Sequence, residues 1–317
     1  MEYNSVYDIR LKMLEKMGGD VTRKYDSVYS IDLAILRLLE EGGGGGEKTY
    51  DYLTFTAIEP SKITYQPSET ATTAQYSYDK VNWETADNVQ LSLNKGDKVY
   101  FKGEITGEQD MMMSAMFRMS GKIEASGSIM SLQAGDPNDK TLKYNYEFSG
   151  LFSYCSSLTT APELPATTLT DYCYYNMFGF CSNLVTAPAI LPATTLANYC
   201  YQEMFQSCSS LVNIPELPAT TLANYCYYSM FLQCTSLTTA PVLPATTLVT
   251  GCYNSMFSSC SSLNYIKALF TTTPSDTYTS GWVSKVASSG TFVKNSAATW
   301  DVTGDNGIPT GWTVETA

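Results

Sequence analysis

The stretch MFGFCSNLVTAPAILPATTLANYCYQE, residues 177–203, decides the fold, because nearly the same phrase recurs on either side of it. Copies aligned on the Met-Phe pair of this phrase are spaced by 26, 27, 26 and 26 residues. They begin at Leu151, Met177, Met204, Met230 and Met256. Because the leucines inside the phrase keep the same spacing, each copy is one unit of a repeat array.

The pattern inside each unit predicts a strand and a helix. Cys173, Met177 and Cys181 stand at i, i+4 and i+8, which is typical of one face of a short helix. The LTTAP segments suit a short strand bounded by proline, and the LPATT segments suit an extended return. A fixed period of roughly 20 to 29 residues with recurrent leucines is typical of a leucine-rich solenoid. We therefore expect about five coils of strand, crossover and helix over residues 151–266.

The consensus MFxxCSSLxxAPxLPATTLxxxCYxx carries a family resemblance over Leu151 to about Ile266. It closely resembles the BspA-like, or Treponema pallidum-type, leucine-rich repeats of gut Bacteroides and their phages. The resemblance implies surface adhesion and partner binding rather than catalysis. It does not name the ligand.

Residues 1–41 are predicted to form two amphipathic helices, and residues 42–47, which begin with five glycines, are predicted to be a flexible linker. Short amphipathic helices cannot bury their apolar faces alone, so we expect them to anchor the chain to a partner. The anchoring residues would be Val6, Ile9, Met13, Val28, Ile31, Ile35 and Leu38. The alternatives are a helical cap folded back on its own chain and a coiled-coil oligomeriser.

The phrase YDSVYSIDLAILRLLEEGGGGG, residues 25–46, resembles the amino-terminal segments of fibre-like virion proteins of crAss-like Bacteroides phages. This resemblance implies that the helices dock into other virion proteins. Fibres of this kind are usually symmetric, so we expect a homo-oligomer. The first twenty residues carry charges throughout, and we expect no secretory signal there.

The remaining segments complete a predicted multidomain α+β fold. Residues 48–150 alternate apolar and polar side chains between turn residues, which predicts an antiparallel β-sandwich that also caps the first coil. Residues 267–317 lose the repeat period and would form a carboxy-terminal cap. In that cap we expect a short helix around residues 282–287, with Trp282, Trp300 and Trp312 sealing the last coil.

The composition of the chain limits the classes of partner that it can bind. The chain of 317 residues has 19 basic and 31 acidic side chains, a net charge of −12, which argues against nucleic acid and against an anionic membrane. No apolar run approaches the roughly 18 residues of a spanning helix, so we expect no membrane insertion. Its nine cysteines fall into two columns of the repeat, and we expect them to be buried free thiols.

We expect the protein to have no enzymatic activity and to bind no cofactor and no metal. The chain contains no histidine, which removes the common nucleophile arrangements and the commonest metal ligand. No glycine-rich phosphate motif follows a strand. Glu163 and Glu216 could be read as paired carboxylates of a glycosidase, but they occupy the same repeat position two coils apart, and the repeat explains them without catalysis.

Tyrosines and threonines are the candidate ligand-facing residues. Tyrosines follow the second cysteine column, and the first of each pair, Tyr174, Tyr201, Tyr227 and Tyr253, is expected to pack between coils with only its hydroxyl in water. Tyr175 and Tyr228 are then the candidates for exposure. Thr160 and Thr239, on the strand face, are the other candidate platform.

These features predict a non-enzymatic virion protein of fibre or decoration type, located on the virion surface. Its helices would hold it on the particle, and its repeats would bind a glycan or protein of the bacterial surface. The alternative is a leucine-rich-repeat adhesin or glycan-binding module of the bacterial cell surface.

Overall fold

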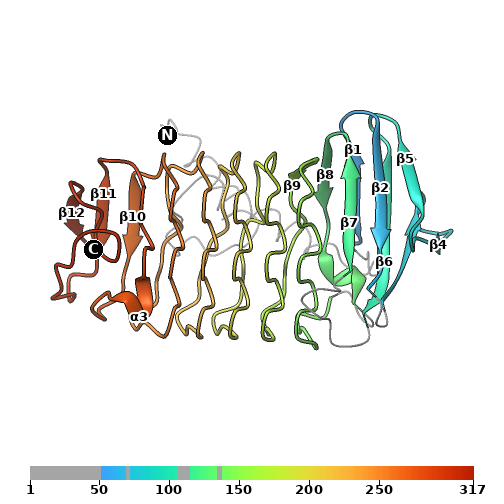
Figure 1. Ribbon diagram of the computed structural model, residues 1–317. Coiled ribbons are helices and arrows are strands. Elements are labelled where there is room, and N and C mark those ends of the chain that lie inside the picture. Colours follow the sequence, from blue (N-terminus) through green and yellow to red (C-terminus); the bar gives the residue numbers. More distant parts are fainter. Residues whose placement is uncertain (1–50, 69–71, 106–114, 134–137) are drawn as a thin grey trace, which may run out of the picture. The chain divides into compact units, whose positions relative to one another are not determined.

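The computed structural model describes residues 51–68, 72–105, 115–133 and 138–317 (Figure 1). These residues belong to one compact unit of the chain, Tyr50–Ala317. The predicted helical pair and glycine linker lie outside the described residues. The same holds for the predicted anchoring residues Val6, Ile9, Met13, Val28, Ile31, Ile35 and Leu38.

Two sheets precede the repeats. Their strands are β1 (Leu53–Ala57), β2 (Ser61–Gln66), β3 (Thr72–Ser77), β4 (Glu84–Thr85), β5 (Gln90–Leu93), β6 (Lys98–Ile105), β7 (Met116–Ser120) and β8 (Ile123–Ser126). One sheet has the order β4-β3-β6-β1-β8-β9, in which β9 (Leu158–Thr160) comes from the first repeat, and the other has the order β5-β2-β7. The pairings among β1 to β8 are antiparallel. In β2 alternate residues are buried and accessible, as a strand covered on one face requires.

Aromatic rings join the two sheets and continue into the repeats. Phe55 of β1 meets Phe117 of β7 with ring centroids 5.0 Å apart. Phe117 in turn stacks on Phe152 of the first repeat, at 5.3 Å and an interplanar angle of 10°. The strand β9 (Leu158–Thr160) pairs in parallel with β8, so the backbone is also continuous from sheet to repeat. The core of the sheets and the core of the repeats are therefore one.

The repeats are built from consecutive turns, not from helices. In the segment that contains Cys173 and Met177, every second amide bonds to the carbonyl three residues earlier, as Tyr175 N does to Tyr172 O at 3.0 Å. The amides between them bond to the next repeat, as Tyr174 N does to Cys200 O at 3.0 Å. An α-helix would instead use all of these amides within the segment. The helix predicted in each coil is wrong.

Left-handed backbone at every fourth residue produces this arrangement. Tyr172, Asn176 and Phe180 have φ of 59°, 49° and 64°, and the same positions of the other repeats repeat the pattern. Each such residue turns the chain, so that pairs such as Cys173 and Tyr174 face inward once every four residues. The turn ladder, as we name it, consists of residues 146–154, 172–180, 199–207, 225–233 and 251–259.

The predicted class, a multidomain α+β chain with a leucine-rich-repeat solenoid of strand, crossover and helix, is wrong for the described residues. They are nearly all β, with mixed and antiparallel sheets. In the described ranges the helices are the short α3 (Asp276–Thr279) and the 3-10 helix η1 (Ile129–Leu132). The physical reason is the turn ladder, in which neighbouring repeats share the amide hydrogen bonds that a helix would keep for itself.

The repeats lie side by side and end in a parallel sheet (Figure 1). Isolated parallel bridges link Thr160 to Thr186 and Thr186 to Asn213, one repeat apart. After the last repeat, β10 (Tyr265–Ala268), β11 (Thr291–Lys294) and β12 (Thr313–Thr316) pair in parallel. Residues 282–287, where a helix was predicted, lie in turns and irregular backbone, and α3 precedes them. That prediction is wrong.

Three tryptophans close the stack, as expected. Trp282, Trp300 and Trp312 are all buried. The Trp282 ring lies 6.2 Å from Phe257, the last phenylalanine of the inner column, and its Nε1 donates to Gly307 O at 2.9 Å. The apolar end of the last repeat is therefore covered by indole rings.

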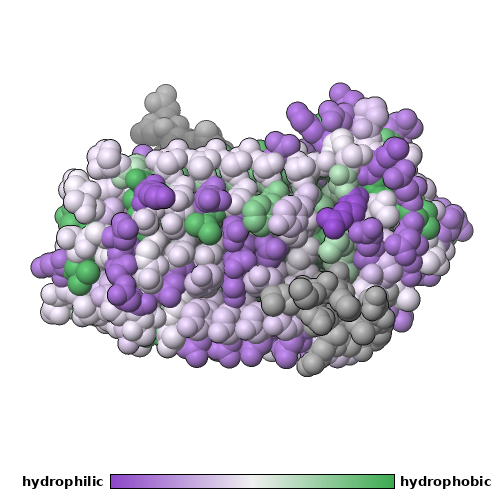
Figure 2. All heavy atoms as spheres, in the orientation of Figure 1, coloured by the Kyte–Doolittle hydropathy of each residue, from purple (hydrophilic) through white to green (hydrophobic). Residues whose placement is uncertain are grey.

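The cysteines are buried free thiols, as predicted. In the first column each Sγ donates to a carbonyl of the preceding repeat or strand, for example Cys181 to Phe152 O at 3.0 Å and Cys208 to Phe178 O at 3.1 Å. The thiols of the first column therefore fill space and add one weak hydrogen bond each. Outside this core, hydrophobic residues on the face seen in Figure 2 are scattered among hydrophilic ones.

Candidate binding surface on the turn ladder

The two tyrosines chosen from the sequence are half-buried on the turn ladder. The Tyr175 ring stands against the Tyr172 ring at 6.3 Å and 71°, and the Tyr228 ring stands against Tyr225 at 6.1 Å and 62°. The Tyr175 hydroxyl also donates to Glu203 Oε2 at 3.1 Å. Both rings are thus held in place while part of their surface remains accessible.

The two threonines chosen from the sequence lie in a different column of the repeat. Thr160 is half-buried at the end of β9 and bridges Thr186, whereas Thr239 is exposed and bridges Tyr265. These bridges are backbone links between neighbouring repeats. The structure therefore places the threonines on the bridged segments and the tyrosines on the turn ladder, not in one common site.

A second row of tyrosines, missed by the sequence interpretation, runs along the turn ladder. The rings of Tyr146, Tyr172, Tyr199 and Tyr225 stack with centroids 4.5, 4.4 and 4.9 Å apart and interplanar angles of 12°, 4° and 5°. All four are half-buried and have left-handed φ between 55° and 59°. We name this row the tyrosine ladder. It ends at Gly251, which occupies the same position in the next repeat.

The sequence did contain a signal for this ladder. The phrases DYCYY, NYCYQ and NYCYY place a tyrosine directly before the second cysteine column as well as after it. The sequence interpretation considered only the tyrosines that follow the cysteine. The turn geometry turns the preceding tyrosine outward.

Burial and the neighbouring groups keep the hydroxyls of the tyrosine ladder neutral. Burial, followed by the neighbouring hydroxyls, raises the pKa of Tyr172 and of Tyr199 above the ordinary value. Burial and the adjacent Glu203 carboxylate raise the pKa of Tyr175 to about 12. The surface therefore presents uncharged phenols at physiological pH.

Amides and a few carboxylates border the tyrosines. Asp171 Oδ1 accepts from Asn198 N at 2.9 Å, and Asn198 Oδ1 accepts from Asn224 N at 3.2 Å. Gln202 Nε2 donates to Glu203 Oε1 at 3.1 Å. Residues 151–266 contain no lysine and no arginine. This surface can therefore contact a ligand through aromatic rings and neutral hydrogen bonds, in a weak negative field.

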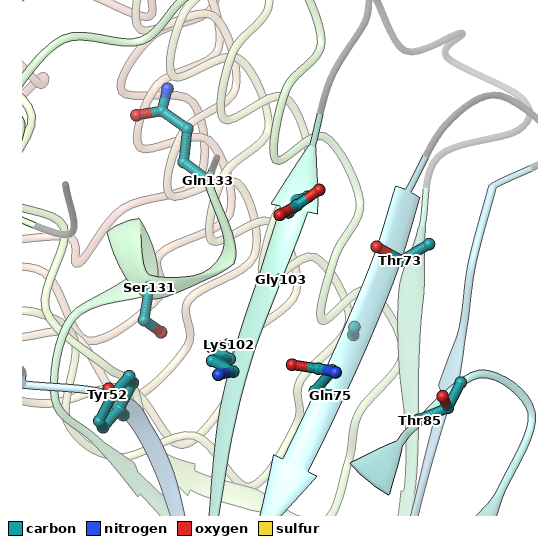
Figure 3. A pocket seen from close by; sticks show the side chains of 10 residues that line it. Tyr52, Thr73, Gln75, Thr85, Lys102, Gly103, Ser131 and Gln133 are labelled. Atoms are coloured by element: carbon teal, nitrogen blue, oxygen red, sulfur yellow. The ribbon is translucent and has the colours of Figure 1, made fainter. Parts of the chain in front are cut away.

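A polar cavity of about 560 Å³ lies in the sheets, bordered by β3, β6 and η1 (Figure 3). Several of its lining side chains have structural partners, although the buried Gln133 Oε1 has none among the described residues. The Lys102 Nζ lies 4.3 Å from the centre of the Trp83 ring, and the Ser131 hydroxyl donates to Phe101 O at 2.9 Å. Gln133 Nε2 donates to Glu147 Oε1 at 2.6 Å. These contacts hold the sheets together, and we assign the cavity no ligand.

Within the described ranges, no group of three or more Asp, Glu, Cys or His side chains could hold a metal ion. No helix in the same ranges is long and apolar enough to cross a membrane. Comparison of the chain with protein-family models, with curated proteins and with solved structures found no match.

Proposed function

We propose that this protein is a non-enzymatic adhesion protein of a phage virion, and that its repeats bind a glycan or protein on the bacterial surface. The tyrosine ladder is the observation that carries the proposal. Four half-buried rings are held in one row by stacking and by their neighbours in the turn ladder. Tyrosine held in this way gives a large amphipathic contact at low cost in conformational entropy.

The anchor half of the proposal rests on sequence alone. The helical pattern of residues 1–41 and its resemblance to virion fibre proteins support docking into a particle. A homo-oligomeric display would then add avidity to contacts that are individually weak. A bacterial cell-surface adhesin with the same repeats is the second candidate, and the resemblance to BspA-like repeats favours it.

Binding to bacterial cells tests the adhesive part. The labelled full-length chain is compared with a Tyr172→Ser, Tyr199→Ser double variant in flow cytometry. Serine is chosen because Ser207 and Ser229 already adopt left-handed φ, 59° and 52°, in the turn ladder. Loss of the ring edges and hydroxyls that the ladder presents should weaken binding at least about tenfold.

The matched control is Gln233→Ser, at an exposed position of the turn ladder that has a left-handed φ of 62° and lies outside the tyrosine ladder. It should bind as the unaltered chain does. If the unaltered chain binds no bacterial cells, or if the ladder variant binds as well as the control, the adhesive proposal is wrong.

Location separates the two candidates. Peptides from residues 1–37 are quantified by mass spectrometry in density-purified phage particles and in host envelopes of the same culture. A fixed ratio to the capsid protein would support the virion protein. Presence in envelopes alone would make it a bacterial adhesin.

A further inference from the structure

Three residues of neighbouring repeats form a line beside the tyrosine ladder. The carbonyls of Tyr175, Gln202 and Tyr228 accept from the amides of the adjoining repeats, at 2.8 to 2.9 Å. They therefore occupy one column of the turn ladder, each one repeat from the next. Tyrosine alternates with glutamine in this column, so Gln202 forms a gap between two rings.

The orientation of these rings differs from that of the tyrosine ladder. In the tyrosine ladder the ring faces are covered by the neighbouring rings, so only the edges and hydroxyls can contact a ligand. Tyr175 and Tyr228 stand at 71° and 62° to the ladder rings beside them, so their faces are not part of that stack. They are half-buried. These two side chains can offer a ring face to the C–H bonds of a flat ligand.

The spacing of the two rings suits an extended chain of sugars. The ladder rings beside them are 4.4 and 4.9 Å apart from repeat to repeat, so Tyr175 and Tyr228 are separated by two such steps. This is comparable with the length of a disaccharide unit in an extended polysaccharide. The Gln202 amide and the Glu203 carboxylate lie between the rings and can hydrogen bond to hydroxyls.

Charge decides the class of sugar. Glu203 is paired with the Tyr175 hydroxyl and the Gln202 amide, and residues 151–266 supply no cation that could neutralise a carboxylate, sulfate or phosphate of a ligand. An anionic glycan would be repelled by this surface. A neutral one would not.

We propose that Tyr175, Gln202, Glu203 and Tyr228 form a subsite for an uncharged, extended polysaccharide that runs along the stack of repeats. Alternate sugar rings pack on Tyr175 and Tyr228, and the sugar between them hydrogen bonds to Gln202 and Glu203. This inference rests on the proposed adhesive function and specifies its ligand class.

Affinity electrophoresis of the full-length chain tests the ligand class. The gels contain mixed-linkage β-glucan, mannan or galactomannan as neutral probes, and alginate or heparin as anionic probes. At least one neutral polysaccharide should retard the chain, and the anionic ones should not. Retardation by the anionic polymers alone would overturn the inference.

Variants locate the site. Tyr175→Ser with Tyr228→Ser should weaken retardation at least about tenfold, because both ring faces are removed. Tyr175→Phe with Tyr228→Phe keeps the faces and should bind within about threefold of the unaltered chain. The control Gln233→Ala, at an exposed position of the turn ladder outside the column, should change nothing. An unchanged serine variant, or a phenylalanine variant as weak as the serine variant, would refute the stacking role.

Cell binding keeps the two proposals separate. If the chain binds bacterial cells but no neutral polysaccharide, the ligand class is wrong and the adhesive function stands. If it binds neither, both are wrong.

Discussion

Two buried tyrosines of the repeats have hydroxyl groups without a hydrogen-bond partner. The hydroxyl oxygens of Tyr174 and Tyr201 are inaccessible to water, and neither has a partner among the described residues. Burying a polar group without a partner costs about 1–3 kcal/mol. The sequence predicted that these hydroxyls would reach water, and that part of the prediction is wrong, because the second cysteine column and the neighbouring rings enclose them.

Removing one such hydroxyl should therefore stabilise the protein. We expect Tyr201→Phe to raise the free energy of unfolding by about 1 kcal/mol, because the ring stack is kept and an unsatisfied group is removed. The free energy is measured by urea unfolding. Tyr175→Phe is the control: its hydroxyl donates to Glu203 Oε2 at 3.1 Å, and the loss of this bond should cost about 1 kcal/mol. Destabilisation by Tyr201→Phe would mean that its hydroxyl is satisfied after all.

Among the individual elements, the turn ladder shows which features of the fold could be predicted from the sequence. The inward direction of Cys173, Met177 and Cys181 was correct, since all three are buried. The predicted type of element was wrong, because a spacing of four residues fits both a helix and a chain of turns. The residues that separate the two are those at the left-handed positions, such as Asn176 and Gly150, which tolerate φ above zero at little cost.

The pairing of strands in the sheets could not be predicted from the sequence in this way. Which segments pair across the sheets depends on contacts far apart in the sequence, such as Phe55 with Phe117, and no local pattern encodes them. The tyrosine ladder was missed for a local reason. The direction of Tyr172 or Tyr199 is set by a left-handed backbone angle, which the spacing of the repeat does not show.

Two glycines of the turn ladder allow a matched test of its geometry. Gly150 and Gly251 have nearly the same φ, 62° and 63°. A Cβ on Gly150 would meet nothing within 4 Å, whereas a Cβ on Gly251 would lie 2.3 Å from the Tyr225 ring. Gly150→Ala should therefore cost only the left-handed backbone strain, about 1–2 kcal/mol.

Gly251→Ala should cost that strain plus about 1–3 kcal/mol of overpacking against the end of the tyrosine ladder. Urea unfolding of both variants measures the difference. Equal losses would show that the Tyr225 ring is free to move away, and that the ladder does not rest on Gly251.

At the scale of the whole molecule, two aromatic columns run through the repeats without a break. Phe152, Phe178, Phe205, Phe231 and Phe257 form one column at spacings of 5.3 to 5.7 Å. Phe148, Tyr174, Tyr201, Tyr227 and Tyr253 form the other, at 5.7 to 5.9 Å. The nine cysteines of the repeats are also buried. The repeats therefore enclose many weakly acidic groups in a medium that disfavours their ionised forms.

Alkaline pH should unfold such a molecule. Burial raises the pKa of Cys155 and of Cys260 to about 12, and it holds the pKa of Tyr174 and Tyr201 well above the ordinary value. In the unfolded chain thiols titrate near about 8.5 and phenols near about 10. Above those values the unfolded state has released protons that the folded state still holds. Stability is therefore fully present below about pH 8 and falls as pH rises through the window from about 8.5 to 12.

Each buried group should contribute a slope of about 1.4 kcal/mol per pH unit once its unfolded form has ionised. The free energy of unfolding is measured between pH 7 and pH 11, with thiol labelling and tyrosinate absorbance recorded on the folded protein. We expect a steep fall above about pH 9 while the folded thiols stay unlabelled. In Tyr201→Phe the free energy of unfolding should fall less steeply with pH above about pH 10, by the contribution of one group, because one buried phenol is gone. A folded protein that labels readily at pH 9 without losing stability would show that the repeats open without unfolding, and that the aromatic columns do not seal the thiols.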